Sequence, residues 1–351
     1  MQSDGLTGQS RPKWVPVLAC VTRSFLFLSA LFLLSSCTGV QSALDPAGTE
    51  ADAVATLFWV MVAGGGLIWL LVVGLVIYAS RLQKAPVTER AAGRVILIGG
   101  GIFPVVVLTA LLAYAVWLMP AMRPWFGGEG EGLRRIEITA EQFWWRVRYL
   151  DSSGSVLRES ANEVHMPVGE RVLFLLKAKD VIHSFWIPAI GGKMDAIPGR
   201  TNALQLEATK PGSYRGVCAE FCGTSHALMA FTVEAKEPAE FESWLASGRP
   251  AQAPATVAAE PSPGLSLFLR NGCAACHAID GTPARGEIGP NLSAFGTRPT
   301  IAAGTLANTT ENLVRFIQHP DAIKPGVRMP GFSMLPRDEV AAIAAYLKGL
   351  E

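Results

Sequence analysis

Hydrophobic residues follow three different patterns along the chain. In the first 119 residues they form long apolar runs, at residues 25–34, 54–79 and 95–119. Between residues 134 and 234 they alternate with polar residues in short runs separated by Gly, Pro and Asp. After residue 264 they recur at helical spacing, as at Val340, Ile343 and Leu347 near the C-terminus. These patterns predict membrane-spanning helices, β-strands and amphipathic helices, in that order.

The two longer apolar runs predict a transmembrane hairpin, with helices at about 54–79 and 95–119. Each run is about the length that a helix needs to cross roughly 30 Å of hydrocarbon. The loop between them sets Arg81, Lys84, Arg90 and Arg94 against the single Glu89. Because basic loops tend to stay in the cytoplasm, everything after residue 119 is expected outside it.

The shorter apolar run belongs to a predicted secretory signal at residues 1–36. Three basic residues precede the run, and Leu34-Ser35-Ser36-Cys37 follows it. Small residues before a cysteine are typical of a bacterial lipoprotein cleavage box, so we expect lipidation of Cys37. The alternative is an uncleaved anchor in which Cys37 is a free thiol, although the run is too short to span a bilayer alone.

The alternating stretch predicts an antiparallel β-sandwich or barrel, because helical signals are nearly absent from it. We expect six strands, at residues 135–139, 145–150, 171–178, 203–207, 214–217 and 230–234. The predicted domains are the hairpin at 37–120, the β domain at 121–246, an Ala- and Pro-rich linker at 247–262, and a helical domain at 263–351. The chain is therefore a multidomain protein.

Composition supports a membrane protein and excludes a nucleic-acid-binding one. Half of the 351 residues are hydrophobic, which exceeds what a soluble globular protein needs. The net charge of +1 lacks the excess of Lys and Arg that a phosphate-binding surface requires. The lipid bilayer and other proteins are the expected partners.

Possible metal ligands are concentrated near the end of the β domain. Cys218, Cys222, His226 and Met229 follow one another closely, and His183 precedes them. Thiolates, imidazoles and a thioether favour copper over Mg²⁺ or Ca²⁺. A mononuclear blue-copper centre uses one cysteine, so two cysteines four residues apart favour a dinuclear centre. A zinc site or a disulfide between the two cysteines is the alternative.

The last domain contains Cys273-Ala274-Ala275-Cys276-His277, which is the c-type haem attachment pattern. The thiols of Cys273 and Cys276 are expected to bind the haem covalently, with His277 as an iron ligand. A redox dithiol is the alternative. Elsewhere, His165 and His319 are expected to be surface or loop-stabilising histidines.

The copper-ligand sequence resembles subunit II of the haem-copper cytochrome c oxidases. The resemblance rests on the run from Cys218 to Met229 and on residues 180–185 and 193–200. It implies a cupredoxin fold and a dinuclear copper A centre. One copper would have His183 and Met229 as ligands and the other would have His226 and the backbone carbonyl of Glu220, with Cys218 and Cys222 bridging both.

In that family the side chain of Glu220 would also reach a Mg²⁺ or Mn²⁺ at the partner interface, which suits a hard cation; a solvated carboxylate is the alternative. The stretch Gln142-Phe143-Trp144-Trp145 resembles the family's electron-entry aromatic patch. Phe143 stands where many members have tryptophan, however, and Trp144 and Trp145 are equally typical of core residues.

Residues 264–351 resemble a small helical cytochrome c domain, with helices expected at 311–318 and 337–350. Met329, which precedes Pro330 as in that family, is the expected sixth iron ligand, because a thioether opposite histidine raises the reduction potential. Met334 is the alternative. No proton-uptake residue is assigned, because Leu97 stands where many members carry glutamate.

These features predict subunit II of a respiratory cytochrome c oxidase in the bacterial cytoplasmic membrane, with its metal domains on the periplasmic side. It would accept electrons from cytochrome c through its haem c and copper A centre and pass them to catalytic subunit I. Oxygen reduction and proton pumping belong to that partner, so no catalytic residue is expected here. The alternatives are a quinol oxidase subunit II, which lacks copper ligands, and a copper- and haem-carrying electron-transfer lipoprotein outside an oxidase.

Overall fold

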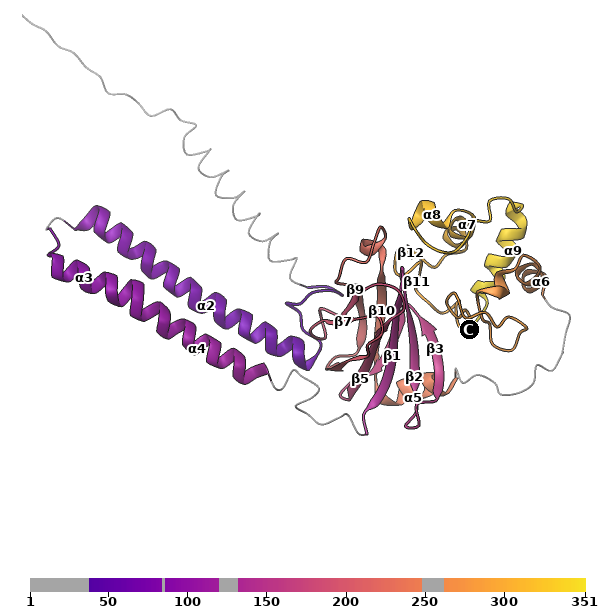
Figure 1. The fold of residues 1–351 in the computed structure, drawn as a ribbon, viewed down its shortest axis with the longest axis horizontal. Coiled ribbons are helices and arrows are strands. Elements are labelled where there is room, and N and C mark those ends of the chain that lie inside the picture. Colours follow the sequence, from indigo (N-terminus) through magenta and orange to yellow (C-terminus); the bar gives the residue numbers. More distant parts are fainter. Residues whose placement is uncertain (1–37, 84–85, 120–131, 248–261) are drawn as a thin grey trace, which may run out of the picture.

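The computed structural model describes residues 38–83, 86–119, 132–247 and 262–351. A helical hairpin, a β-sandwich and a helical domain follow one another along the chain, and the β-sandwich lies between the other two parts (Figure 1). The predicted fold class is confirmed in this order of elements. The predicted signal at residues 1–36, Cys37 and most of the linker lie outside the described residues.

The hairpin consists of two long helices; the first ends in a π-helical segment, and a π-helical segment interrupts the second. The elements are α2 (Thr49–Ile77), η2 (Tyr78–Leu82), α3 (Glu89–Leu97), η3 (Ile98–Ile102) and α4 (Phe103–Leu118). The two spans have a mean hydropathy of 2.6, and their most apolar windows are not buried by protein. Their length and composition fit a bilayer. Both begin earlier than predicted, because polar residues at their N-terminal ends also adopt helical structure.

Two five-stranded sheets form the β-sandwich, in the orders β3-β2-β1-β5-β8 and β4-β10-β9-β6-β7. The strands are β1 (Arg134–Glu141), β2 (Trp144–Leu150), β3 (Val156–Ala161), β4 (Glu163–Pro167), β5 (Arg171–Ala178), β6 (His183–Trp186), β7 (Met194–Ala196), β8 (Asn202–Glu207), β9 (Gly212–Cys218) and β10 (Ala230–Lys236). Most pairs are antiparallel, whereas β1 with β5 and β10 with β4 are parallel. Aromatic side chains fill the space between the sheets, namely Trp145, Phe174, Phe185 and Phe231.

All six predicted strands are present, but β3, β4, β6 and β7 were missed. Three of the four have at most five residues, which is too short for an alternating pattern to distinguish a strand from a loop.

A helix that the sequence did not reveal, α5 (Pro238–Ser247), follows the last strand. Its Trp244 lies against Tyr149, with ring centroids 5.0 Å apart, and stacks on His165 at 3.8 Å. His165 is therefore only 5% exposed. The prediction of a surface or loop-stabilising role for His165 is wrong, because His165 lies within the edge strand β4 and α5 covers it.

The helical domain has its own hydrophobic core. Its elements are α6 (Pro263–Arg270), η7 (Cys273–Ala275), β11 (Thr300–Ile301), β12 (Leu306–Ala307), α7 (Thr310–Gln318), α8 (Pro320–Ile323) and α9 (Arg337–Lys348). Val340, Ile343 and Leu347 of α9 are buried, as their spacing predicts, and they share a core with Phe268 and Leu313. Both predicted helices are present.

The hydroxyl of Tyr149 joins the two sheets, because it accepts a hydrogen bond from the backbone N–H of His165 at 2.6 Å. Burial raises the pKa of this phenol, so it stays neutral.

We expect Tyr149→Phe to lower the free energy of unfolding by about 1–3 kcal/mol, because a buried N–H loses its acceptor. Denaturant unfolding of the full chain in detergent measures the effect. Tyr214→Phe is the control, since its exposed hydroxyl donates to Lys210. Equal effects of both substitutions would contradict this account.

Candidate metal centre

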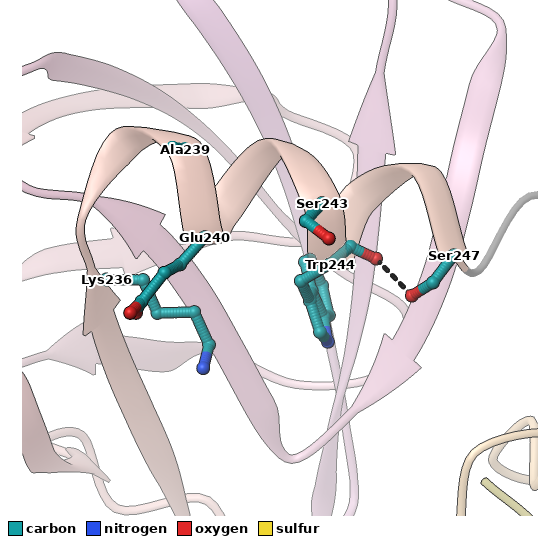
Figure 2. Close-up of a pocket in the computed structure, with 6 residues that line it drawn as sticks. All are labelled: Lys236, Ala239, Glu240, Ser243, Trp244 and Ser247. Atoms are coloured by element: carbon teal, nitrogen blue, oxygen red, sulfur yellow. Dashed lines mark hydrogen bonds between the residues drawn. The ribbon is translucent and has the colours of Figure 1, made fainter.

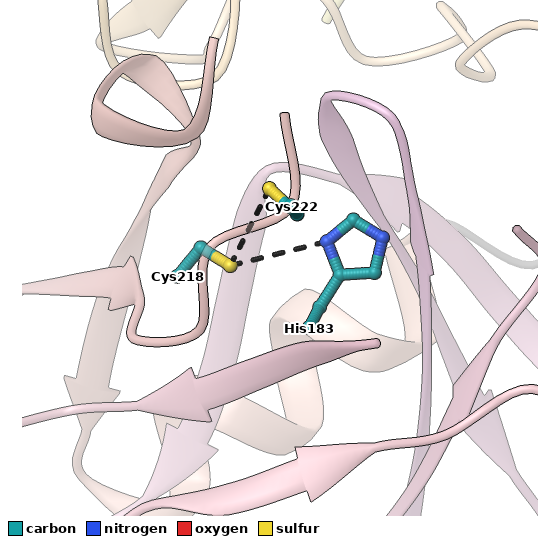
Figure 3. Close-up of side chains that lie close together, drawn as sticks. All are labelled: His183, Cys218 and Cys222. Carbon is teal, nitrogen blue, oxygen red and sulfur yellow. Dashed lines mark hydrogen bonds between the residues drawn. The ribbon is translucent and has the colours of Figure 1, made fainter. Parts of the chain in front are cut away.

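Strand pairing brings the first histidine of the predicted copper site to the cysteines. Phe185 of β6 pairs with Cys218 at the end of β9, so His183, two residues before Phe185, lies beside the cysteine loop. Figure 3 shows His183, Cys218 and Cys222 pointing toward one another. The two sulfurs are 3.8 Å apart, and Sγ of Cys218 is 3.9 Å from Nδ1 of His183.

The other predicted donors surround the same two sulfurs. Sγ of Cys222 lies 3.7 Å from Nδ1 of His226, which begins the 3₁₀ turn η6 (His226–Leu228), and 3.8 Å from Sδ of Met229. The carbonyl oxygen of Glu220 lies 3.2 Å from Sγ of Cys218. The four other predicted donor groups therefore converge on two free, buried thiols. Soft sulfur and imidazole donors in this arrangement fit copper.

The two thiols differ in acidity because they contact each other. The contact with Cys222 lowers the pKa of Cys218, and the same contact raises the pKa of Cys222. Metal binding requires thiolates, so a bound cation has to displace the proton that Cys222 retains.

Asp180 orients the imidazole of His183. Its Oδ1 lies 2.9 Å from Nε2 of His183, and its carboxylate also accepts hydrogen bonds from the backbone N–H groups of Gln142 and Val181. Because Nε2 donates to Asp180, Nδ1 is left with its lone pair toward the sulfurs, as a metal ligand requires. Burial opposes the charged imidazole, but hydrogen bonds to Cys218 and Asp180 outweigh it and raise the pKa of His183. The sequence analysis assigned no role to Asp180.

A cavity in the helical domain contains the haem-attachment motif. It is lined by Cys273, Cys276 and His277. The ring of His277 donates from Nδ1 to the carbonyl of Pro290 at 2.8 Å, which leaves Nε2 available to bind iron. A side chain at position 289 would lie 2.6 Å from this ring, so Gly289 is needed there. Burial lowers the pKa of His277, which favours the neutral imidazole that metals bind.

The same cavity distinguishes the two candidate methionines and adds an arginine. Met329 lines the cavity, whereas Met334 is 74% exposed. Arg298 also lines it, and its buried Nε has no hydrogen-bond partner in the described structure. A buried cation with an unpaired donor suits an anionic group, such as a haem carboxylate. The residues present therefore fit haem c, although no sequence signal pointed to Arg298.

The remaining predicted groups are the side chain of Glu220 and the aromatic residues, of which Phe143 and Trp144 also line the haem cavity. Glu220 is exposed, so its side chain is available to a partner or an interface cation. Trp145 is fully buried, and its ring makes an edge contact with His183 at 6.1 Å. Phe143 is 4% exposed, and Trp144 lies under the guanidinium of Arg146 at 4.7 Å. These aromatic residues do not form an exposed patch.

A second pocket runs along α5 (Figure 2). Lys236, Glu240 and Trp244 are among its lining residues, and no predicted site residue is.

A hairpin of membrane-spanning length, a β-sandwich with a two-cysteine metal loop and a c-type haem domain define a membrane-anchored electron-transfer protein. Residues 135–236 match the family model described as cytochrome c oxidase subunit II, periplasmic domain, and residues 262–351 match the one described as cytochrome c. Cytochrome c oxidase subunit 2 of Alkalihalophilus pseudofirmus is 35% identical over 338 residues, which cover 93% of this chain and 96% of the relative.

The subunit 2 of Bacillus subtilis is 32% identical over 353 residues, covering 94% of this chain and 98% of the relative. The crystal structure of the periplasmic domain of subunit II of cytochrome oxidase from Bradyrhizobium japonicum is 33% identical, covers 33% of this chain and 92% of that one, and has a TM-score of 0.31. The chain belongs to the cytochrome c oxidase subunit 2 family. It is thus a membrane protein with a periplasmic, cupredoxin-like domain that implies copper A and a cytochrome c domain that implies haem c.

We expect Asp180→Asn to lower copper affinity by roughly 10- to 100-fold, because His183 loses the carboxylate that fixes its ring. Copper competition with a chelator measures the affinity in the full chain. The matched control is Asp45→Asn, since Asp45 is exposed and forms a surface ion pair with Lys210 at 3.7 Å. An affinity equal to that of the control would show that Asp180 does not support the copper ligand.

Proposed function

We propose that this chain is the electron-entry subunit of a respiratory cytochrome c oxidase in a bacterial cytoplasmic membrane. Cytochrome c would be its donor, and catalytic subunit I, where O₂ is reduced to water and protons are pumped, would be its acceptor. One observation carries the proposal. Gln142 lines the haem cavity and donates from Nε2 to the carbonyl of Cys222 at 2.6 Å, so the two candidate redox sites share a wall.

The candidate ligands divide between two sites. His183, Cys218, the carbonyl of Glu220, Cys222, His226 and Met229 would hold two copper ions; Cys273 and Cys276 would bind haem c, with His277 and Met329 on its iron. When bound, both groups supply reversible one-electron chemistry.

Groups of the protein orient the ligands of both sites. Asp180 and the carbonyl of Pro290 hold one imidazole each in the tautomer that leaves a nitrogen free. The cysteines of the copper loop are buried, which excludes water and limits side reactions. The exposed carboxylate of Glu220 is the proposed contact to Mg²⁺ or Mn²⁺ at the interface with the catalytic subunit. Lipidation of Cys37 would add a second membrane anchor.

Metal analysis, optical spectra and EPR of the full chain test this proposal, using a host that matures c-type haem. We expect two coppers that share one unpaired electron and one low-spin haem c in each chain. Cys222→Ser should abolish the shared-electron signal and leave the haem spectrum unchanged, because it would remove one of the two thiolates proposed to hold the copper ions. A single copper, or zinc in its place, would refute the electron-entry role.

The sixth iron ligand is tested by replacing each methionine separately. Met329→Leu should remove the methionine-to-iron absorption band and lower the reduction potential of the haem, because the thioether is lost. Met334→Leu should change neither, since this side chain is exposed. Retention of the band in Met329→Leu together with its loss in Met334→Leu would reverse the assignment.

A further inference from the structure

A lysine of the cytochrome domain is bonded to the backbone of the copper loop. Lys324 follows α8, and it is only 2% exposed. Its Nζ donates to the carbonyl of Leu228 at 2.9 Å and to the carbonyl of Ala302 at 2.9 Å. Leu228 lies in η6, directly before Met229 and two residues after His226. A single side chain thus joins the two domains next to two candidate copper ligands.

Burying this ammonium group is expensive. An ion moved out of water loses its hydration free energy unless its partners compensate, and here the partners are neutral carbonyls. Burial lowers the pKa of Lys324 to about 7, which reflects that cost. An apolar side chain would fill the position at lower cost but could not select one orientation of the two domains. The lysine therefore indicates that a defined orientation matters at this interface.

Further polar contacts support the same orientation. The carbonyl of Pro325 accepts hydrogen bonds from the hydroxyls of Thr224 at 3.0 Å and Ser225 at 2.6 Å. The backbone N–H of Ala230, at the start of β10, donates to the carbonyl of Ala303 at 3.0 Å. Directional bonds of this kind fix how the domains sit, since each is lost when the domains separate or rotate.

The side chain of Phe143 fills the space between the two domains. It lines the haem cavity, and its ring is so close to both backbones that added Cβ atoms at Gly223 and Gly326 would lie 3.1 and 3.4 Å from it. Gly223 follows Cys222 in the copper loop, whereas Gly326 belongs to the cytochrome domain. A larger indole would have little space here. Phenylalanine at position 143 therefore suits a contact between the two domains rather than an exposed binding site for another protein.

We propose that Lys324 holds the cytochrome domain on the copper loop in one fixed orientation, so that this chain's own cytochrome domain occupies the surface beside Phe143. The inference rests on the proposed function, which it deepens by naming the partner of that surface. An external cytochrome would then approach the outer face of the cytochrome domain and would not contact the copper loop.

The test compares Lys324→Met with wild type in the full, metal-loaded chain in detergent. Hydrogen exchange reports docking without any electron transfer. The amide of Ala230 should exchange roughly tenfold or more faster in the variant, because its bond to Ala303 opens more often. Flash-induced electron transfer from haem to copper should slow by a similar factor and become dependent on solvent viscosity. Lys210→Met is the matched control, since Lys210 is exposed and lies in the β domain.

The possible outcomes separate the two proposals. Unchanged exchange and unchanged transfer in Lys324→Met would overturn the docking role. Protection of Ala230 in wild type without any transfer from haem to copper would instead refute the proposed function. If Lys324→Met does not fold, Thr305→Val replaces it, because the Thr305 hydroxyl also donates to the carbonyl of Leu228, at 3.3 Å. The hydrogen-exchange rate of the Ala230 amide should then rise in Thr305→Val. An unchanged exchange rate in that variant would overturn the proposal.

Discussion

The contact between two cysteine sulfurs 3.8 Å apart is the feature on which the rest of the site depends. The contact exists because the loop after β9 turns Cys222 back toward Cys218 at the end of that strand. The pairing of β6 with β9 then sets His183 beside Cys218. The aromatic core packs against β6, because Trp145 makes edge contacts with His183 and Phe185. Two thiols held this close can contact the same metal ion, and their contact lowers the pKa of Cys218.

The second constraint is the surface shared by the haem cavity and the copper loop. Gln142 and Phe143 belong to the β domain but line the cavity of the cytochrome domain. A tethered domain is present at high effective concentration, yet a tether alone does not choose an orientation. Hydrogen bonds from Lys324, Thr224 and Ser225 join the two domains in one orientation. Tethering and docking together remove the need for a diffusional encounter at the copper loop.

Much of the fold was predictable because its signals are local. The apolar runs identify the hairpin helices by length, and alternation located six of the ten strands of the sandwich. Strand β4 was missed because its alternating pattern covers only five residues. Its Val164 and Met166 face the core between the sheets, whereas α5 covers His165 through Trp244. The burial of this polar side chain depends on packing and does not follow from the residue types of the strand.

The sequence by itself determined the chemistry, because most donors of each site stand close together in the chain: Cys218, Cys222, His226 and Met229 in one loop, and Cys273, Cys276 and His277 in the other motif. Asp180 also contacts His183 from only three residues away. Only the tertiary structure decided which distant residues join those donors. It brought His183 to Cys218 by strand pairing, Arg298 and Met329 rather than Met334 into the haem cavity, and Lys324 onto the carbonyl of Leu228. These contacts join residues whose meeting depends on how strands pair and domains pack, a property that the residue types alone do not specify.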